Sequence, residues 1–264
     1  MRSYKIHFIR HGFTKANLDG QYIGITDMPI CPEGFKQLEE MSSFKYPNIE
    51  KVYSSPLERC MQTGLYLFDG VEMETIKELR EMDLGDFEGK TLEEMKDDID
   101  FNNWLRDNMN NPPPNGEKSD EFASRIACAF DDIIHDMSKN HLIETAVVTH
   151  GTVIMGLCAM CGYPRQEMRY WASNSGCGYT LSTSVSMWMH DQCFEVISTL
   201  PFENRDEDEE EVQLSEEERE RYEQLKAEFP DSKIGGISPN LANLEDVRSI
   251  FKTVAATYGC IDIL

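Results

Sequence analysis

The feature of this chain that most constrains its fold is a continuous β-branched and apolar run, Thr145-Ala146-Val147-Val148-Thr149. A strand without polar alternation is buried on both faces, which is typical of the centre of a parallel sheet. A similar apolar run, Tyr4 to Ile9, opens the chain. Strand-like and helix-like segments alternate around these two runs. The sequence therefore predicts an α/β fold, a three-layer α/β/α sandwich with a mainly parallel central sheet.

Capping residues and apolar spacing predict the other elements. Helices are expected over 32–41, 119–137 and 153–161, with a short one capped by Thr91 and Glu94. A further helix is expected to begin with Ser55 as N-cap and Pro56 in the first position. Strands are expected over 51–54, 71–76, 179–187 and 193–200.

The composition changes at Pro201. Residues 203–211 are nearly all acidic, which predicts a solvated linker, and two amphipathic helical patterns follow. We expect a catalytic domain over 1–202 and a C-terminal extension over 203–264, made of the acidic linker and two helices. These helices are expected to pack on the catalytic domain or to pair in a homodimer. A partner-binding element or a lid over the active site is the alternative.

Charge and cysteine content exclude several classes of protein. The net charge is -23, with 48 acidic and 25 basic residues, which argues against nucleic-acid or anionic membrane partners. No apolar run could span a bilayer and no signal peptide precedes the first strand, so a cytoplasmic location is expected. Cys158 and Cys161 form a CxxC without the partners of a zinc set, and we interpret them as core residues.

Two strand-like runs end in the same dipeptide, His-Gly, at His11 and His150. Neighbouring strands lie ~4.8 Å apart, so the carboxyl ends of parallel strands can present side chains to one ligand. Arg10 precedes His11, and Arg59 falls in the first turn of the helix after the third strand. A lone His after a strand is usually an ordinary loop residue. Two His and two Arg around a phosphate-sized space, however, predict phosphoryl transfer.

The chemistry assigns a role to each of these groups. A neutral His11 is expected to attack phosphorus and form a phosphohistidine. Arg10, Arg59 and a protonated His150 are expected to hold the phosphoryl oxygens. Because this cluster supplies the positive charge, neither a metal nor another cofactor is expected.

The leaving oxygen needs a proton from a carboxyl group with a raised pKa. Glu81 is the first candidate, and Glu88 and Asp83 are weaker ones because loop carboxylates are usually solvated. The loop after the nucleophile is expected to line the leaving-group side, where Tyr22 and Phe13 either stack on the substrate or pack internally. The residues expected to bind substrate are Asn17, Gln21, Tyr22, Ile23, Gly24 and Gly151.

Five ordered segments resemble the histidine phosphatase superfamily, in its phosphoglycerate mutase-like branch. They are Arg10-His11-Gly12-Phe13-Thr14-Lys15-Ala16-Asn17, the loop from Gln21 to Gly34, Tyr53-Ser54-Ser55-Pro56-Leu57-Glu58-Arg59-Cys60-Met61-Gln62-Thr63, Leu79-Arg80-Glu81 through Gly89, and Val147-Val148-Thr149-His150-Gly151. The resemblance covers about residues 4–200. It implies that His11 is phosphorylated, that Glu81 donates the proton, and that Arg10, Arg59 and His150 complete the phosphate pocket, with Asn17 beside it.

Two segments resemble phosphatases rather than mutases. Met82-Asp83-Leu84-Gly85 follows Glu81, where mutases of the family usually have Arg-His-Tyr-Gly. Pro113-Pro114-Asn115-Gly116-Glu117, followed by Arg125, resembles a segment of the broad-specificity and α-ribazole phosphatases, with Lys118 where Ser is usual. The resemblance implies a metal-independent phosphatase of small phosphorylated metabolites such as α-ribazole 5′-phosphate or sugar phosphates. A cofactor-dependent phosphoglycerate mutase and a non-catalytic interaction protein are the alternatives.

Overall fold

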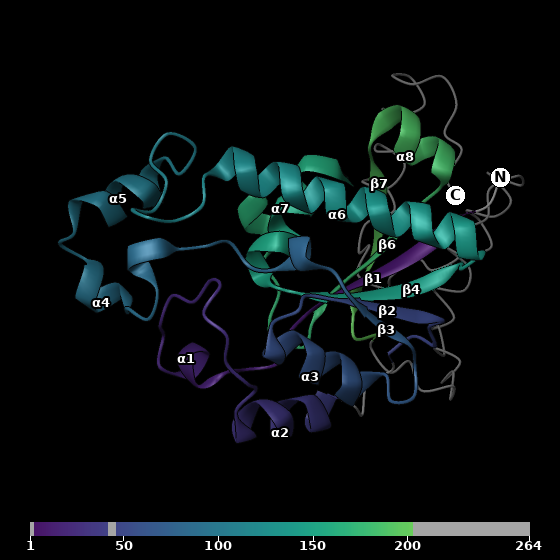
Figure 1. Cartoon of the computed structure of the whole chain (residues 1–264), viewed down its shortest axis with the longest axis horizontal. Helices are drawn as coiled ribbons and strands as arrows, with labels where there is room; N and C mark the ends of the chain where they lie inside the picture. Colours follow the sequence, from purple (N-terminus) through teal and green to yellow (C-terminus); the bar gives the residue numbers. More distant parts are fainter. Residues whose placement is uncertain (1–2, 42–45, 203–264) are drawn as a thin grey trace, which may run out of the picture. The chain divides into compact units, whose positions relative to one another are not determined.

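A computed structural model of the chain describes residues 3–41 and 46–202 (Figure 1). Its strands are β1 (Tyr4–Arg10), β2 (Lys51–Ser54), β3 (Met73–Thr75), β4 (Glu144–Thr149), β5 (Gly162–Tyr163), β6 (Gly178–Thr183) and β7 (Phe194–Leu200). Its α-helices are α1 (Lys15–Leu18), α2 (Pro32–Met41), α3 (Glu58–Leu67), α4 (Leu92–Met95), α5 (Ile99–Arg106), α6 (Ser119–Asn140), α7 (Gly151–Cys161) and α8 (Val185–Asp191). Three short 3₁₀ helices complete the list, η1 (Lys77–Leu79), η2 (Gly85–Phe87) and η3 (Met168–Trp171). The expected extension over 203–264 lies outside the described residues.

The strands form one mixed sheet in the order β3-β2-β4-β1-β6-β7-β5. The pairs β3-β2, β2-β4 and β4-β1 are parallel, as is β5-β7, whereas β6 runs antiparallel to both of its neighbours. Figure 1 shows α6 and α7 on one side of the sheet and α2 and α3 on the other. The three-layer α/β/α architecture with a mainly parallel sheet is therefore confirmed, and β3 lies at an edge.

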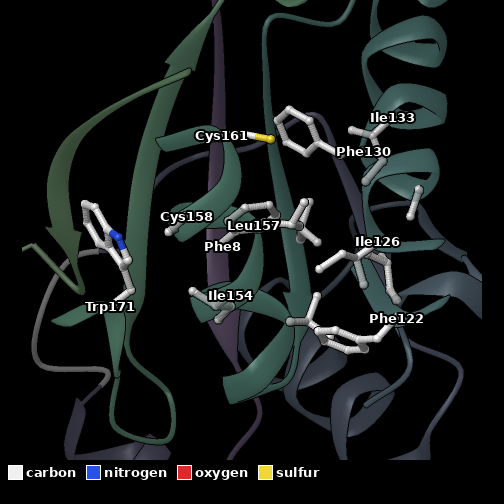
Figure 2. Packing of buried hydrophobic residues seen from close by; sticks show 14 of the residues in the cluster. Phe8, Phe122, Ile126, Phe130, Ile133, Ile154, Leu157, Cys158, Cys161 and Trp171 are labelled. Atoms are coloured by element: carbon white, nitrogen blue, oxygen red, sulfur yellow. The ribbon is translucent and has the colours of Figure 1, made fainter. Parts of the chain in front are cut away.

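The larger core lies between the sheet and the α6–α7 layer (Figure 2). The α6 side chains that fill it repeat at helical spacing and are Phe122, Ile126, Ala129, Phe130, Ile133, Ile134 and Met137. They face α7, whose Cys158 and Cys161 are buried, as expected of core residues. The core thereby fixes α7, and with it the residues at the start of that helix, against β1.

Several predicted boundaries differ from the structure, and two of the differences have a clear local reason. The predicted strand 179–187 is wrong beyond Thr183, because the Ser184 hydroxyl accepts a hydrogen bond from Met187 N (3.1 Å) and begins α8. Helix α3 begins at Glu58, because the Ser55 hydroxyl accepts from Leu57 N (3.3 Å) within the preceding turn rather than capping the helix. The predicted helix 32–41 and the capping box of α4 are confirmed.

No helix within residues 3–41 and 46–202 is long and apolar enough to cross a membrane.

Candidate active site

The two histidines after the strand ends lie side by side. His11 follows β1 and His150 follows β4, and the parallel register pairs Arg10 with Thr149, the residues just before them. The centroids of the two imidazole rings are 5.2 Å apart. Both side chains are buried. The sheet thus brings two segments that are far apart in sequence to one point, beyond the carboxyl ends of adjacent strands.

The hydrogen bonding of His11 fixes which ring nitrogen is available. Its Nδ1 lies 2.7 Å from the carbonyl oxygen of Gly12, and because a carbonyl only accepts, Nδ1 carries the proton. Nε2 therefore keeps its lone pair. Burial, followed by the charges of Arg59 and Arg10, holds the pKa of His11 well below its ordinary value. His11 is neutral at neutral pH, as a nitrogen nucleophile must be.

His150 is also neutral in this structure, in contrast to the protonated His150 that the sequence led us to expect. Its Nδ1 accepts a hydrogen bond from Nε of Arg59 (3.3 Å), so its proton is on Nε2, 2.8 Å from the Ser55 hydroxyl. Burial, and then the positive charge of Arg59, lower its pKa well below the ordinary value. A phosphate dianion placed nearby would act in the opposite direction.

Arg59 is held rigidly by the loop that follows the nucleophile. Its two terminal nitrogens donate to the carbonyl oxygens of Thr26 (2.9 Å) and Gly24 (2.7 Å). Gly24 is required here because a Cβ atom on it would lie 2.0 Å from the carbonyl oxygen of Met82. The loop also caps α3, since a carboxylate oxygen of Asp27 accepts from Glu58 N (2.7 Å). The guanidinium group is thus fixed before any ligand arrives.

Glu88, one of the weaker proton-donor candidates, holds this same loop. One of its carboxylate oxygens accepts from Ile25 N (2.8 Å) and the other from Thr26 N (3.1 Å). Both oxygens are therefore engaged with the backbone. Asp83, the other weak candidate, accepts from Gly85 N (2.9 Å) and shapes its own turn.

Arg10 presents a donor that no other group of the described residues uses. Its terminal nitrogen donates to the carbonyl oxygen of Ser173 (2.8 Å), whereas its Nε is buried and has no hydrogen-bond partner there. The guanidinium group lies along Gly151, where a Cβ atom would be 3.5 Å from Nε. Buried donors are nearly always satisfied, so an unpaired one suggests an anion as its natural partner.

Glu81 is the buried carboxyl group of the site. Its two oxygens accept from Met82 N (2.8 Å) and from Thr152 N (3.2 Å), the latter in the first turn of α7. Burial raises the pKa of Glu81, and these N–H groups together with Arg59 and Arg10 offset part of the effect. A raised pKa in a carboxyl group that is bonded to Thr152 N, two residues after His150, is what a proton donor needs.

The residues expected to bind substrate fall into two sets. The oxygen of Asn17 accepts from both N (3.0 Å) and Oγ1 (3.1 Å) of Thr14 in a capping box, so only its amide nitrogen remains available to a ligand. Gly24 and Gly151 lie against Arg59 and Arg10, as described above.

The other set consists of Gln21, Tyr22 and Ile23, which lie between Asn17 and Gly24. Gln21 and Ile23 are half-buried there. The ring of Tyr22 packs edge-on against Phe101 and Trp104, with centroids 5.3 and 6.1 Å away. Of the two alternatives that the sequence left open for Tyr22, the structure favours internal packing.

Several supporting residues were not singled out from the sequence. Thr63 and Ser55 bond to Gly12 and His150, and the carbonyl of Thr26 holds Arg59. Thr63, Ser55 and Thr26 lie within quoted motifs, so their positions were a usable signal, although their partners were not. Within the part of the chain that the structure describes, no group of three or more His, Cys, Asp or Glu is arranged to hold a metal ion.

Comparison with known proteins agrees with this geometry. Residues 6–191 match the model of the histidine phosphatase superfamily (branch 1). The chain belongs to this superfamily, as the five motifs indicated, and it is a phosphatase.

Several relatives and solved structures are similar to this chain over most of their own length. The chain is 28% identical over 165 residues to "Putative phosphoserine phosphatase 2" of Hydrogenobacter thermophilus, covering 60% of this chain and 79% of the relative. It is 30% identical over 180 residues to an adenosylcobalamin/alpha-ribazole phosphatase of Escherichia coli, covering 66% and 87%. The alpha-ribazole phosphatase structure from Shigella flexneri superposes with a TM-score of 0.61 at 25% identity, covering 73% of this chain and 94% of that one.

A phosphoglycerate mutase structure from Bacillus anthracis superposes with a TM-score of 0.62 at 21% identity, covering 75% of this chain and 92% of that one. This likeness shows the shared fold.

Proposed function

We propose that this phosphatase hydrolyses small phosphomonoesters through a phosphohistidine formed on Nε2 of His11. The observation that carries the proposal is the state of His11: its Nδ1 is bound to Gly12, its pKa is lowered, and Nε2 is free to attack. The unpaired Nε of Arg10 and the preset guanidinium of Arg59 supply positive charge beside it.

In the first step, Nε2 of His11 attacks phosphorus and the P–O ester bond breaks. The leaving oxygen takes the proton of Glu81, so an alcohol departs and the carboxylate remains. Arg10, Arg59 and a protonated His150 stabilise the charge that spreads over the three equatorial oxygens. A bound phosphoryl group favours the protonated form of His150, which strengthens this contact.

In the second step, water attacks the phosphohistidine. The Glu81 carboxylate takes a proton from that water, the P–N bond breaks, and phosphate leaves with His11 neutral again. Both steps use side chains for charge stabilisation and proton transfer, so we expect activity to persist in EDTA.

The proposed substrate class rests on the names of the relatives. Relatives carry the names of alpha-ribazole and phosphoserine phosphatases, and we propose α-ribazole 5′-phosphate, phosphoserine and sugar phosphates as the first substrates to test. A mutase would share the first step but would return the phosphoryl group to the bound product. The cytoplasmic location stays a prediction from the sequence.

The test is phosphate release from a panel of phosphomonoesters with EDTA present. The panel contains the three proposed substrates, 3-phosphoglycerate and p-nitrophenyl phosphate, and 2-phosphoglycerate formation is followed in parallel. We expect release from at least one small phosphomonoester and an acid-labile phosphoryl group on His11 after rapid quenching. His11→Ala should abolish both. Isomerisation without release would establish a mutase instead, and turnover by His11→Ala would exclude the phosphohistidine.

Glu81→Gln tests the proton donor. General acid catalysis typically contributes about 10²–10⁴-fold, and only poor leaving groups need it fully. We expect alkyl phosphates to be slowed by about that factor and p-nitrophenyl phosphate by much less. Equal slowing of both substrates would remove Glu81 from the acid role.

A further inference from the structure

Every N–H donor of Arg125, on α6, is hydrogen-bonded either to Glu117 or to a backbone carbonyl of the segment that contains Glu81. Its Nε and one terminal nitrogen donate to the two carboxylate oxygens of Glu117. Its terminal nitrogens also donate to the backbone carbonyls of Glu78 (2.6 Å), Arg80 (2.8 Å) and Glu81 (2.9 Å). A guanidinium group offers five donors in a rigid fork, and no other side chain can reproduce this pattern.

Arg125 bonds to three of the four backbone carbonyls of residues 78–81, and another residue bonds to the fourth. The carbonyl of Leu79 accepts from the hydroxyl of Thr149 (2.7 Å), the residue directly before His150. Four successive carbonyl oxygens, including that of Glu81, are thus held by side chains from α6 and β4. The backbone that carries the buried carboxyl group is therefore fixed on one side by Arg125 and on the other by the strand that carries His150.

Glu117 holds Arg125 in place and joins the segment 113–117 to the same loop. Its side chain is 8% exposed, and it also accepts from Asp83 N (3.3 Å). The two loops touch closely, because a Cβ atom on Gly85 would lie 2.1 Å from the carbonyl of Pro114. A buried ion pair contributes little net stability compared with apolar residues of similar volume, so its presence here calls for another explanation.

We propose that Arg125, oriented by Glu117, is a positioning residue that sets the carboxyl group of Glu81 at the start of α7, where it protonates the leaving group. This inference rests on the proposed function and deepens it. Arg125 bonds to the backbone of residue 81, whereas Thr152 N bonds to its carboxylate. Without the hydrogen bonds from Arg125, the Glu81 carboxyl group can still donate a proton but is no longer held in position. A displacement of about 1 Å can lower the rate about 100-fold.

The experiment compares Arg125→Met and Glu117→Gln with the wild type on two substrates, with folding of each variant checked by urea denaturation. One substrate is the alkyl phosphate that the wild type hydrolyses fastest, and the other is p-nitrophenyl phosphate. For Arg125→Met we expect kcat to fall about 100-fold on the alkyl phosphate and less than about fivefold on the aryl phosphate. The isosteric Glu117→Gln should show the same selectivity with a loss of about tenfold. Lys139→Met, an exposed charge on the same helix, is the matched control and should change neither rate.

A second measurement separates positioning from general damage to the fold. If Arg125 acts through Glu81, the double variant with Glu81→Gln should be no slower on the alkyl phosphate than Glu81→Gln by itself. Additive losses, or equal losses on both substrates, would overturn the inference while leaving the phosphohistidine mechanism intact. Failure of the proposed function is recognised separately, by a wild type that releases no phosphate or by an active His11→Ala. If Arg125→Met does not fold, Glu117→Gln decides by the same two criteria.

Discussion

Thr63→Val tests whether one buried hydroxyl couples the nucleophile loop to the helix of Arg59. Thr63 is fully buried on α3. Its hydroxyl accepts from the backbone N–H of Gly12 (2.9 Å) and donates to the carbonyl of Arg59 (2.7 Å). Valine has nearly the same shape, so the substitution removes both hydrogen bonds while it leaves the packing in place.

The expected magnitude follows from the two lost bonds. The N–H of Gly12 would remain buried without an acceptor, which costs about 1–3 kcal/mol, and the lost bond to Arg59 adds about 1 kcal/mol. The free energy of unfolding should therefore fall by about 2–4 kcal/mol. Because the carbonyl of Gly12 fixes the ring of His11, we also expect kcat/KM to fall by about 10- to 100-fold.

Urea denaturation of the wild type, Thr63→Val and Thr63→Ser provides the measurement. Serine keeps the hydroxyl and loses only a methyl group, which should cost about 1 kcal/mol. The hydroxyl account predicts that valine is the more destabilising of the two substitutions. A valine variant as stable and as active as the serine variant would refute the reasoning, because it would assign the role of Thr63 to its methyl group.

Three further outcomes are expected. Glu88→Gln places an amide donor against the backbone N–H groups of the loop that fixes Arg59, and it should weaken inhibition by inorganic phosphate about tenfold. An unchanged inhibition constant would show that Glu88 does not affect phosphate binding through this loop. The acid limb of the kcat/KM profile should lie below pH 6.5, because burial and Arg59 lower the pKa of His11 and activity is lost only as pH falls through that lowered pKa. A limb at or above pH 6.5 would show that His11 is not the titrating nucleophile. Removal of residues 203–264 should change the assembly state in sedimentation if the extension forms a homodimer. Unchanged stability, assembly and substrate preference would exclude both interpretations of the extension, that is, packing or dimerisation on one hand and partner binding or a lid on the other.

Local patterns predicted the elements whose causes are local. The apolar runs of β1 and β4, the helical stripe of α6 and the capping box of α4 are set by residues within a few positions of one another. Where a tertiary contact decides, the same reasoning failed. Helix α8 begins at a local cap, the Ser184 hydroxyl, but its position depends on Trp188, which packs on Phe130 with ring centroids 4.6 Å apart. Helix α8 has only seven residues, which is too short for helical periodicity to be recognised in the sequence.

The candidate site divides in the same way. Its histidines, its two arginines and Glu81 could be named from the sequence, because each follows a recognisable strand or lies in a segment that resembles a known family. The protonation of His150 could not be named, since it depends on burial and on the approach of Arg59. The hydrogen bonds of Glu88 could not be named either, because their donors lie on a loop more than sixty residues earlier in the sequence.

The sequence by itself determined the layers of the fold, the superfamily and the chemical groups of the site, because periodicity, turn residues and ordered motifs are properties of short segments. Only the tertiary structure decided the antiparallel course of β6, the neutral state of His150 and the contacts of Arg125 with the backbone of Glu81. The physical reason is that strand direction, burial and hydrogen-bond partners depend on which distant segments meet, and no short stretch of the chain contains that information.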